Sequence, residues 1–314
     1  MTISESFSPD HPELLIDIVL PVAETAPDRG WPTIVWVHGG GWRMQDRLAR
    51  PDFSRHFASR GIAMASIDYR LAPENRHPAQ VADLRQALRW LRANSENLGI
   101  DPYRIGLWGS SAGGHVAAFT ALSSETAELA GETVPADFAQ WPTAVSCVVE
   151  GYGPTLIGEL LPDRISAVSA EHTPEEDLLG GPAASESEKS GLLARAAEAS
   201  PALLDASDAP PFLILHGTGD TLVPHSQSQE LHDHLQAAGS ESLLCLIEGF
   251  GHGFFNPGEV EELGPGRRLD NGRLEAEPDT ACTFAGNGSF STRARGASFE
   301  LIHDFFAHHL SVGR

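Results

Sequence analysis

The chain has few cysteines, and their positions exclude the usual cysteine-based sites. Three are present among 314 residues, and no two of them share a metal-ligand or redox spacing. Cys147 and Cys245 lie in the apolar runs VSCVVE and LLCLIE, where we expect small buried side chains. An odd number of cysteines, completed by Cys282, fits a reducing compartment.

Long apolar runs are also missing. No stretch approaches the roughly 18 apolar residues that a membrane-spanning helix needs. The first fifteen residues, MTISESFSPDHPELL, contain Glu5 and Asp10, no basic residue and no apolar core of signal-peptide length. We therefore expect a cytoplasmic protein without a membrane partner.

Basic residues are scarce. Lysine and arginine total 21 against 43 aspartates and glutamates, so the formal net charge is −22. A surface this acidic repels nucleic acid and anionic lipid head groups, and we expect neither as a partner. With 41% hydrophobic and 20% charged residues, the composition is that of a globular protein.

What the chain does contain is an alternation of two periodicities. Continuous apolar runs indicate buried strands, whereas apolar residues at spacings of three and four indicate helix faces. Strands are expected at 14–20, 33–38, 62–68, 104–108, 144–151, 210–217 and 242–248, and helices at about 81–99, 112–124, 227–238 and 298–310. This order predicts an α/β protein whose mostly parallel sheet carries helices on both faces. Ligands of such sheets bind beyond the carboxyl ends of the strands.

A candidate nucleophile lies between an expected strand and an expected helix. Residues 109–113, Gly-Ser-Ser-Ala-Gly, match the G-x-S-x-G pattern of a sharp turn that raises a serine above the sheet. Ser111 holds the central position and is the predicted nucleophile, whereas Ser110 holds a variable one. The alternative is a glycine-rich turn with an incidental serine.

A serine hydroxyl needs a general base and an orienting carboxylate. In this type of fold the carboxylate follows the serine along the chain, and the histidine base follows the carboxylate. Asp220 comes directly after the expected strand 210–217, and His252 lies in the glycine-rich loop after the next strand. Asp208 and Glu248 are weaker alternatives for the carboxylate. The other histidines match no named metal spacing, so we expect no metal.

Three consecutive glycines follow the strand at 33–38. Attack on a carbonyl places negative charge on its oxygen, which backbone N–H groups stabilise where no side chain blocks the approach. The sequence HGGGW (38–42) supplies such a loop, and we expect the amides of Gly40, Gly41 and Ala112 to form an oxyanion hole.

These motifs resemble those of a known family. HGGGW (38–42), DYRLAPE (68–74), GSSAGGH (109–115), GYGPT (151–155), HGTGDTLVP (216–224) and GHGF (251–254) are similar to the bacterial α/β-hydrolase esterases related to hormone-sensitive lipase. Within that group the chain most resembles the bifunctional feruloyl/acetyl-xylan esterases. The resemblance implies the α/β-hydrolase fold with a small cap, a Ser111–Asp220–His252 triad and no cofactor.

The resemblance also frames the domain organisation. We expect one α/β-hydrolase domain over 1–314, with a cap at 154–200. Relatives have a short connection after the catalytic histidine, whereas here residues 256–298 form an unusual insertion without clear periodicity. Such a loop is typically a lid, a binding loop or a mobile excursion.

Three aromatic residues beside the motifs, Trp42, Tyr152 and Phe254, are candidates for the substrate pocket, with plain core packing as the alternative.

The predicted activity is serine carboxylic-ester hydrolysis of small or short-acyl esters. An amidase, arylformamidase or peptidase would use the same triad, and a binding protein on this scaffold is the non-enzymatic alternative. Acetyl, feruloyl and short aliphatic esters all stay open as substrates, and a homodimer through the sheet edge or last helix is compatible with the fold.

Overall fold

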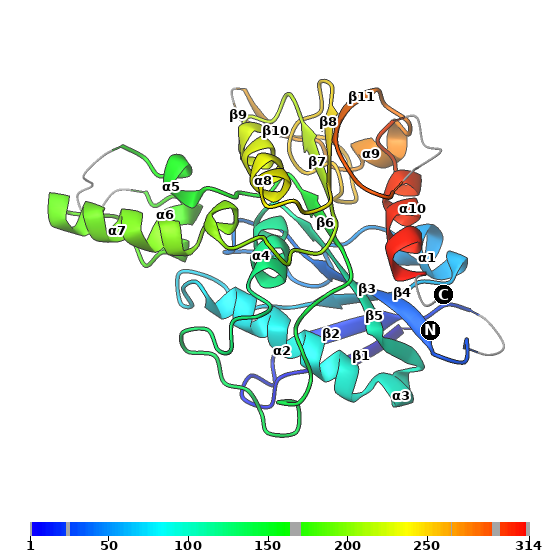
Figure 1. The fold of residues 1–314 in the computed structure, drawn as a ribbon. Helices are drawn as coiled ribbons and strands as arrows, with labels where there is room; N and C mark the ends of the chain where they lie inside the picture. The colour runs from blue at the N-terminus through cyan, green and yellow to red at the C-terminus, as the bar shows by residue number, and fades with distance from the viewer. Residues whose placement is uncertain (1, 23–25, 164–170, 265, 291–295, 312–314) are drawn as a thin grey trace.

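The computed structural model describes residues 2–22, 26–163, 171–264, 266–290 and 296–311. Within these ranges a nine-stranded sheet runs through the molecule in the order β1-β2-β4-β3-β5-β6-β7-β8-β11 (Figure 1). The strands are β1 (Thr2–Ser6), β2 (Leu15–Val19), β3 (Trp31–Val37), β4 (Ala63–Ile67), β5 (Ile100–Ser110), β6 (Val148–Gly151), β7 (Phe212–Gly217), β8 (Ser242–Ile247) and β11 (Cys282–Gly286). The predicted α/β-hydrolase fold, with its mostly parallel sheet, is confirmed.

The middle of the sheet is parallel and its edges are antiparallel. Strands β3 to β8 pair in parallel, while β2 joins β4, β1 joins β2, and β11 joins β8 in antiparallel register. The parallel strands consist mostly of buried apolar residues, as expected where helices cover both faces.

Two apolar layers sandwich the sheet. One face carries α2 (Ala79–Ala93), α4 (Ala112–Leu122) and α8 (Ser226–Ala237), and the other carries α1 (Phe53–His56) and α10 (Phe299–Leu310) (Figure 1). The second layer is aromatic, with Trp36 against Trp108 at a ring-centroid distance of 4.7 Å. These layers place the carboxyl ends of the parallel strands at one rim of the sheet.

Some element boundaries differ from the sequence prediction. The helix expected to reach Gly99 ends at Ala93, and a short α3 (Ser95–Leu98) follows. Asn94 is the C-cap, and both its amide and its side chain donate to the Trp90 carbonyl. The strand predicted at 144–151 is shorter, because β6 begins at Val148, and β1 was not predicted because its residues are mostly exposed.

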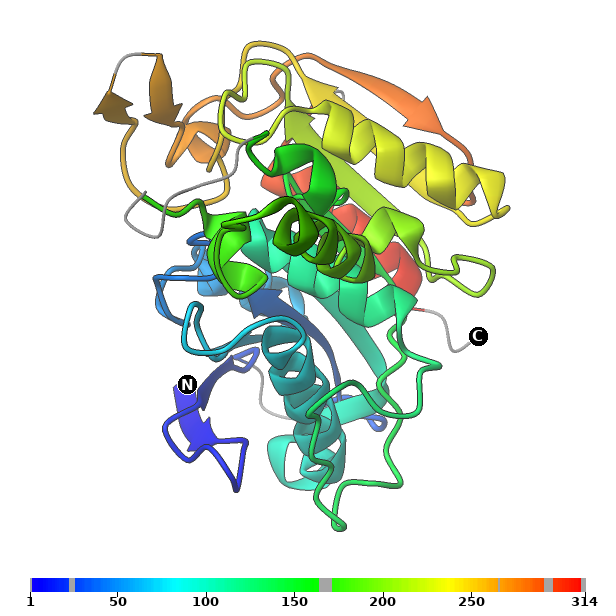
Figure 2. The same ribbon diagram turned by 90° about the vertical axis from the view of Figure 1, so that its left-hand side faces the viewer.

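The segment predicted as a cap lies on the outer side of α4 (Figures 1 and 2). It contains α5 (Ile157–Leu160), α6 (Pro174–Leu178) and α7 (Glu186–Glu198), and the short turn Pro201–Leu203 comes directly after it. Its residues 164–170 lie outside the described part. Thr173 begins α6 with a capping box, accepting from the Glu176 amide while the Glu176 carboxylate accepts from the Thr173 amide. The helix start is therefore well defined.

The insertion after His252 has more regular structure than its sequence indicates. It forms β9 (Glu261–Gly264), β10 (Arg267–Leu269) and α9 (Arg273–Ala276), and its strand β11 pairs with β8 at the sheet edge (Figure 2). Residues 265 and 291–295 lie outside the described part. The elements are too short for their periodicity to be read from sequence; β9 and β10 pair with each other, whereas β11 needs its partner β8 from elsewhere in the chain.

In the part of the chain that is described, no helix is both long and apolar enough to cross a lipid bilayer.

A carboxyl group lies deep in this core. Glu150 of β6 is fully buried; its Oε1 accepts from the Gly153 amide at 2.5 Å, and its Oε2 lies 3.4 Å from the Ser228 hydroxyl. Burial raises the pKa of Glu150 from 4.5 to about 8, although both contacts favour the charged form. Glu150 is therefore neutral near pH 7.

We predict that Glu150→Gln changes the pH dependence of stability. The folded protein holds the Glu150 proton up to about pH 8, whereas the unfolded chain releases it near pH 4.5, so stability falls as pH rises between these values. Glutamine cannot ionise. The variant should gain stability over wild type by roughly 1 kcal/mol per pH unit from pH 5 to 8, measured by urea unfolding. The exposed Glu186→Gln should show no such trend, and an equal difference at both pH values would contradict the prediction.

A second prediction concerns the aromatic layer. The ring of Phe306 is fully buried and lies so close to β5 that a Cβ on Gly106 would come within 2.8 Å of it. Phe306→Ala should lower the free energy of unfolding by about 3–5 kcal/mol, through lost burial and the cavity left behind. Leu203→Ala, at a side chain that is 59% exposed, should cost less than about 1 kcal/mol. Equal losses in the two variants would contradict this account.

Candidate active site

Ser111 occupies a strained turn between β5 and α4. Its φ is 53°, a left-handed value that a residue with a side chain rarely adopts. The flanking glycines make the turn possible: a Cβ on Gly109 would lie 2.1 Å from the Gly113 carbonyl oxygen, and one on Gly113 equally close to that of Val37. The turn leaves the Ser111 hydroxyl at the rim of the sheet and at the N-terminus of α4.

Three predicted residues meet in one hydrogen-bonded chain. His252 Nε2 lies 2.7 Å from Ser111 Oγ, and His252 Nδ1 lies 2.6 Å from Asp220 Oδ2. They come from the loops after β5, β7 and β8, so the carboxyl ends of three parallel strands bring them together. A base in contact with a hydroxyl and oriented by a carboxylate can take up the hydroxyl proton.

Asp220 is held by its own loop. Its Oδ1 accepts from the amides of Leu222 and Val223 at 2.8 and 3.0 Å, and its side chain is buried. Burial alone would raise the pKa of Asp220, but the facing His252 and His216 hold it well below its usual range. Asp220 is therefore an anion that faces His252 Nδ1.

His216 was missed by the sequence analysis. Its Nε2 lies 3.3 Å from Asp220 Oδ2 and 3.0 Å from the Val223 carbonyl, and its Nδ1 lies 2.7 Å from the Ser228 hydroxyl. Because its Nε2 faces two acceptors, that nitrogen carries the proton, and burial lowers the pKa of the ring. Its position at the end of β7, four residues before Asp220, is the sequence signal that could have identified it as a neighbour of this carboxylate.

Two of the three predicted pocket aromatics lie behind the histidine. The ring of Tyr152 stands 4.8 Å from that of His252, and Phe254 packs on Tyr152 at 4.5 Å. Both are buried, and neither is among the residues that line the cavity in front of Ser111. Both side chains belong to the aromatic layer, which agrees with the core-packing alternative for these two residues.

The glycine loop faces the same site. Gly40 and Gly41 have φ values of 96° and 60°, and their amides, like that of Ala112, donate to no acceptor in the described ranges. The Tyr69 hydroxyl fixes the loop by contacting the His38 and Gly39 carbonyls at 3.0 and 3.1 Å. These amides are free to donate to a ligand.

A cavity of about 250 Å³ opens in front of Ser111. Trp42 lines it, as predicted, and donates from its indole nitrogen to His115 at 3.1 Å. The remaining lining residues come from the glycine loop, the turn at Ser111, the segment predicted as a cap, the aspartate loop, the histidine loop and the insertion. They are Gly41, Ser111, Ala112, Pro154, Leu160, Thr173, Pro174, Glu175, Leu222, Val223, His252 and Arg267.

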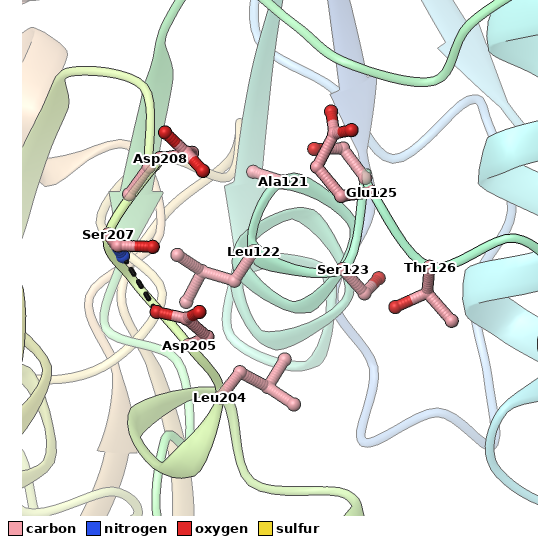
Figure 3. Close-up of a pocket in the computed structure, with 11 residues that line it drawn as sticks. Ala121, Leu122, Ser123, Glu125, Thr126, Leu204, Asp205, Ser207 and Asp208 are labelled. Carbon is pink, nitrogen blue, oxygen red and sulfur yellow. Dashed lines mark hydrogen bonds between the residues drawn. The ribbon is translucent and has the colours of Figure 1, made fainter.

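A second cavity, of about 270 Å³, lies at the far end of α4 and is lined by none of Ser111, Asp220 and His252, although it includes Asp208, a weaker alternative for the carboxylate (Figure 3). Its acidic side chains are Glu125, Asp205 and Asp208, and Asp205 accepts from the Ser207 amide at 2.9 Å. In the described ranges, no group of three or more His, Cys, Asp or Glu side chains could hold a metal ion.

The sequence matches the model of the BD-FAE family over residues 16–235. This range contains Ser111 and Asp220 and ends before His252. Among curated proteins, esterase LipC of Mycobacterium tuberculosis is 30% identical over 249 residues, which is 78% of this chain and 58% of the relative. The chain thus spans less than two thirds of the length of that relative.

Two solved structures illustrate the fold. A truncated carbohydrate esterase from gut microbiota is 24% identical with a TM-score of 0.72, covering 99% of this chain and 96% of that one. An esterase from Thermogutta terrifontis, solved with bound butyrate, is 26% identical with a TM-score of 0.63, covering 82% and 87% of the two chains. The family match covers well over half of the sequence, and the chain therefore belongs to the BD-FAE family.

Proposed function

We propose that the protein is a serine hydrolase of carboxylic esters, with Ser111 as nucleophile, His252 as general base and Asp220 as its orienting carboxylate. The observation that carries the proposal is the unbroken contact from Ser111 Oγ through His252 to Asp220, at 2.7 and 2.6 Å. The position of Ser111 beside the amides of the glycine loop and beside a cavity supports the same conclusion.

The proposed reaction has two halves. Ser111 Oγ attacks the ester carbonyl while His252 Nε2 takes its proton, and the resulting oxyanion accepts from the amides of Gly40, Gly41 and Ala112. His252 then gives this proton to the alkoxy oxygen as the carbon–oxygen bond to the alcohol breaks, and the acyl group stays bound to Ser111 Oγ. In the second half His252 activates a water molecule that releases the acid. No step needs a metal or cofactor.

The names of the relatives favour esters over amides. The similar proteins include esterase LipC and the Thermogutta terrifontis esterase with bound butyrate. The cavity of about 250 Å³ lies below the roughly 300–1,000 Å³ of sites for drug-sized ligands, which favours small or short-acyl substrates. We include amides as competing substrates in the tests, because the same triad can cleave them.

The arrangement around the cavity extends the proposal to the domain organisation. Leu160, Thr173, Pro174 and Glu175 line the cavity, which supports a cap role for residues 154–200 within one α/β-hydrolase domain. A small-molecule ester is the proposed partner. The cytoplasmic location and the homodimer stay predictions.

The nucleophile can be tested with a neighbouring serine as control. Ser111→Ala should lower kcat/KM for p-nitrophenyl butyrate by at least about 10³-fold, because loss of a triad nucleophile removes the covalent route. Ser110→Ala should stay within about threefold, since no contact joins its hydroxyl to His252. Initial rates on ester and anilide substrates, together with labelling by a fluorophosphonate probe, provide the measurement. Full activity in Ser111→Ala would refute the assignment.

The acyl pocket can be tested through its cap-side wall. A Cβ on Gly41 would lie only 3.2 Å from the side chain of Pro174, so this proline narrows the cavity opposite the glycine loop. Wild type should hydrolyse p-nitrophenyl butyrate at least about tenfold better than octanoate in kcat/KM, because the longer acyl chain can enter the narrowed cavity only by overpacking against Pro174. Pro174→Ala should reduce this ratio severalfold. Pro182→Ala, outside the cavity lining, should leave it unchanged, and a preference for octanoate in wild type would contradict the proposed pocket.

A further inference from the structure

The loop that carries His252 is held from two sides. On one side it contacts the aspartate loop: the Gly219 amide donates to the Phe250 carbonyl at 2.8 Å, and the Gly249 amide donates to Thr218 Oγ1 at 3.0 Å. On the other side it contacts residues 268–273, which belong to the insertion. We call residues 268–273 the clamp.

Asp270 is the centre of the clamp and contacts the main chain on both sides of the Gly251–His252 peptide. Its Oδ2 accepts from the Gly251 amide at 2.5 Å, and its own amide donates to the His252 carbonyl at 2.6 Å. Leu269 continues the contact as a parallel bridge with His252. One residue thus fixes the peptide group from which the imidazole side chain projects.

The charge on Asp270 is balanced within the clamp. Asp270 is fully buried; Arg268 Nε lies 2.8 Å from its Oδ1, and Arg273 Nη1 lies 2.8 Å from its Oδ2. Arg273 also donates to the Gly249 carbonyl at 2.7 Å and lies over the Phe250 ring at 4.1 Å. A buried carboxylate with two guanidinium partners is a fixed acceptor, because water does not reach its oxygens to compete with these partners.

The place of these contacts relates them to the reaction. The imidazole must keep two short contacts at once, to Ser111 and to Asp220, and a displacement of about 1 Å can cost roughly 10²-fold in rate. Gly251 and Gly253 flank His252, and Gly253 has a φ of 86°, so the local sequence offers little rigidity of its own. External contacts must therefore fix the loop.

We propose that Asp270 is a positioning residue for His252, so that the insertion is a working part of the active site rather than a separate lid. This inference rests on the proposed esterase function. Asp270 touches no reacting atom and acts through the main chain of His252.

The test compares two substitutions of Asp270 with a matched control. Asp270→Ala removes the acceptor for the Gly251 amide, and we expect kcat for p-nitrophenyl butyrate to fall about 30- to 100-fold with KM within threefold. Asp270→Asn keeps an oxygen that can accept from that amide. The loss in log kcat should therefore be smaller than in Asp270→Ala by at least a third. Asp279→Asn, at an exposed position of the same insertion, should match wild type.

A second measurement does not depend on catalysis. Amide hydrogen exchange of peptides covering 249–253 should be at least tenfold faster in Asp270→Ala than in wild type, while peptides covering 105–120 should be unchanged. If Asp270→Ala does not fold, Asp270→Asn carries the test: it should lower kcat about three- to tenfold without changing KM. Wild-type kcat together with wild-type exchange in Asp270→Asn would then overturn the inference.

The outcomes separate this inference from the proposed function. If wild type hydrolyses no ester, or Ser111→Ala is fully active, the proposed function fails irrespective of Asp270. If wild type is active, Ser111→Ala is inactive and folded Asp270→Ala keeps kcat within threefold, only the positioning role fails. A rise in KM alone would also overturn it, because it would place Asp270 in substrate binding.

Discussion

The close approach of backbone to backbone around Ser111 is the constraint on which the rest of the site depends. Gly109, Gly113 and the carbonyl of Val37 lie so near one another that a single Cβ on either glycine would overlap a carbonyl oxygen. This packing forces the left-handed φ of Ser111 and aims its hydroxyl away from the sheet. The histidine, the aspartate and the glycine loop are arranged around a serine that cannot move far.

The other groups reach that serine from separate parts of the chain, and each is held by buried polar contacts. Tyr69 secures the glycine loop, His216 and two amides secure Asp220, and the clamp secures the histidine loop. Such contacts are strong only when every partner is present, because an unpaired buried polar group is costly. The site is thus a set of loops, each stabilised by buried polar contacts on the side away from the cavity.

The sequence predicted the parts of the molecule whose signals are local. Apolar runs and helical spacing located the parallel strands and main helices, and the order of Ser111, Asp220 and His252 after successive strands placed them at one rim. The clamp was not predictable, because Asp270 meets Gly251 only after the chain has passed through β9 and β10. For Tyr152 and Phe254 the sequence left two alternatives, pocket or core, because their position beside the motifs does not say which way a side chain points. Packing against the sheet placed both in the core.

The position of Pro174 opposite Gly41, where it leaves little room for a side chain on the glycine, bears on two properties that active sites often combine. The glycine loop belongs to the sheet framework that arranges the reacting groups, whereas Pro174 begins α6 in the segment outside α4. The width available to a substrate is therefore set by a helix that takes no part in bond making or breaking. Under the proposed function, a substitution of Pro174 changes the space beside the reacting groups from a helix that carries none of them, while Asp177 of the same helix ties α6 to Arg43, directly after the glycine loop, at 3.1 Å.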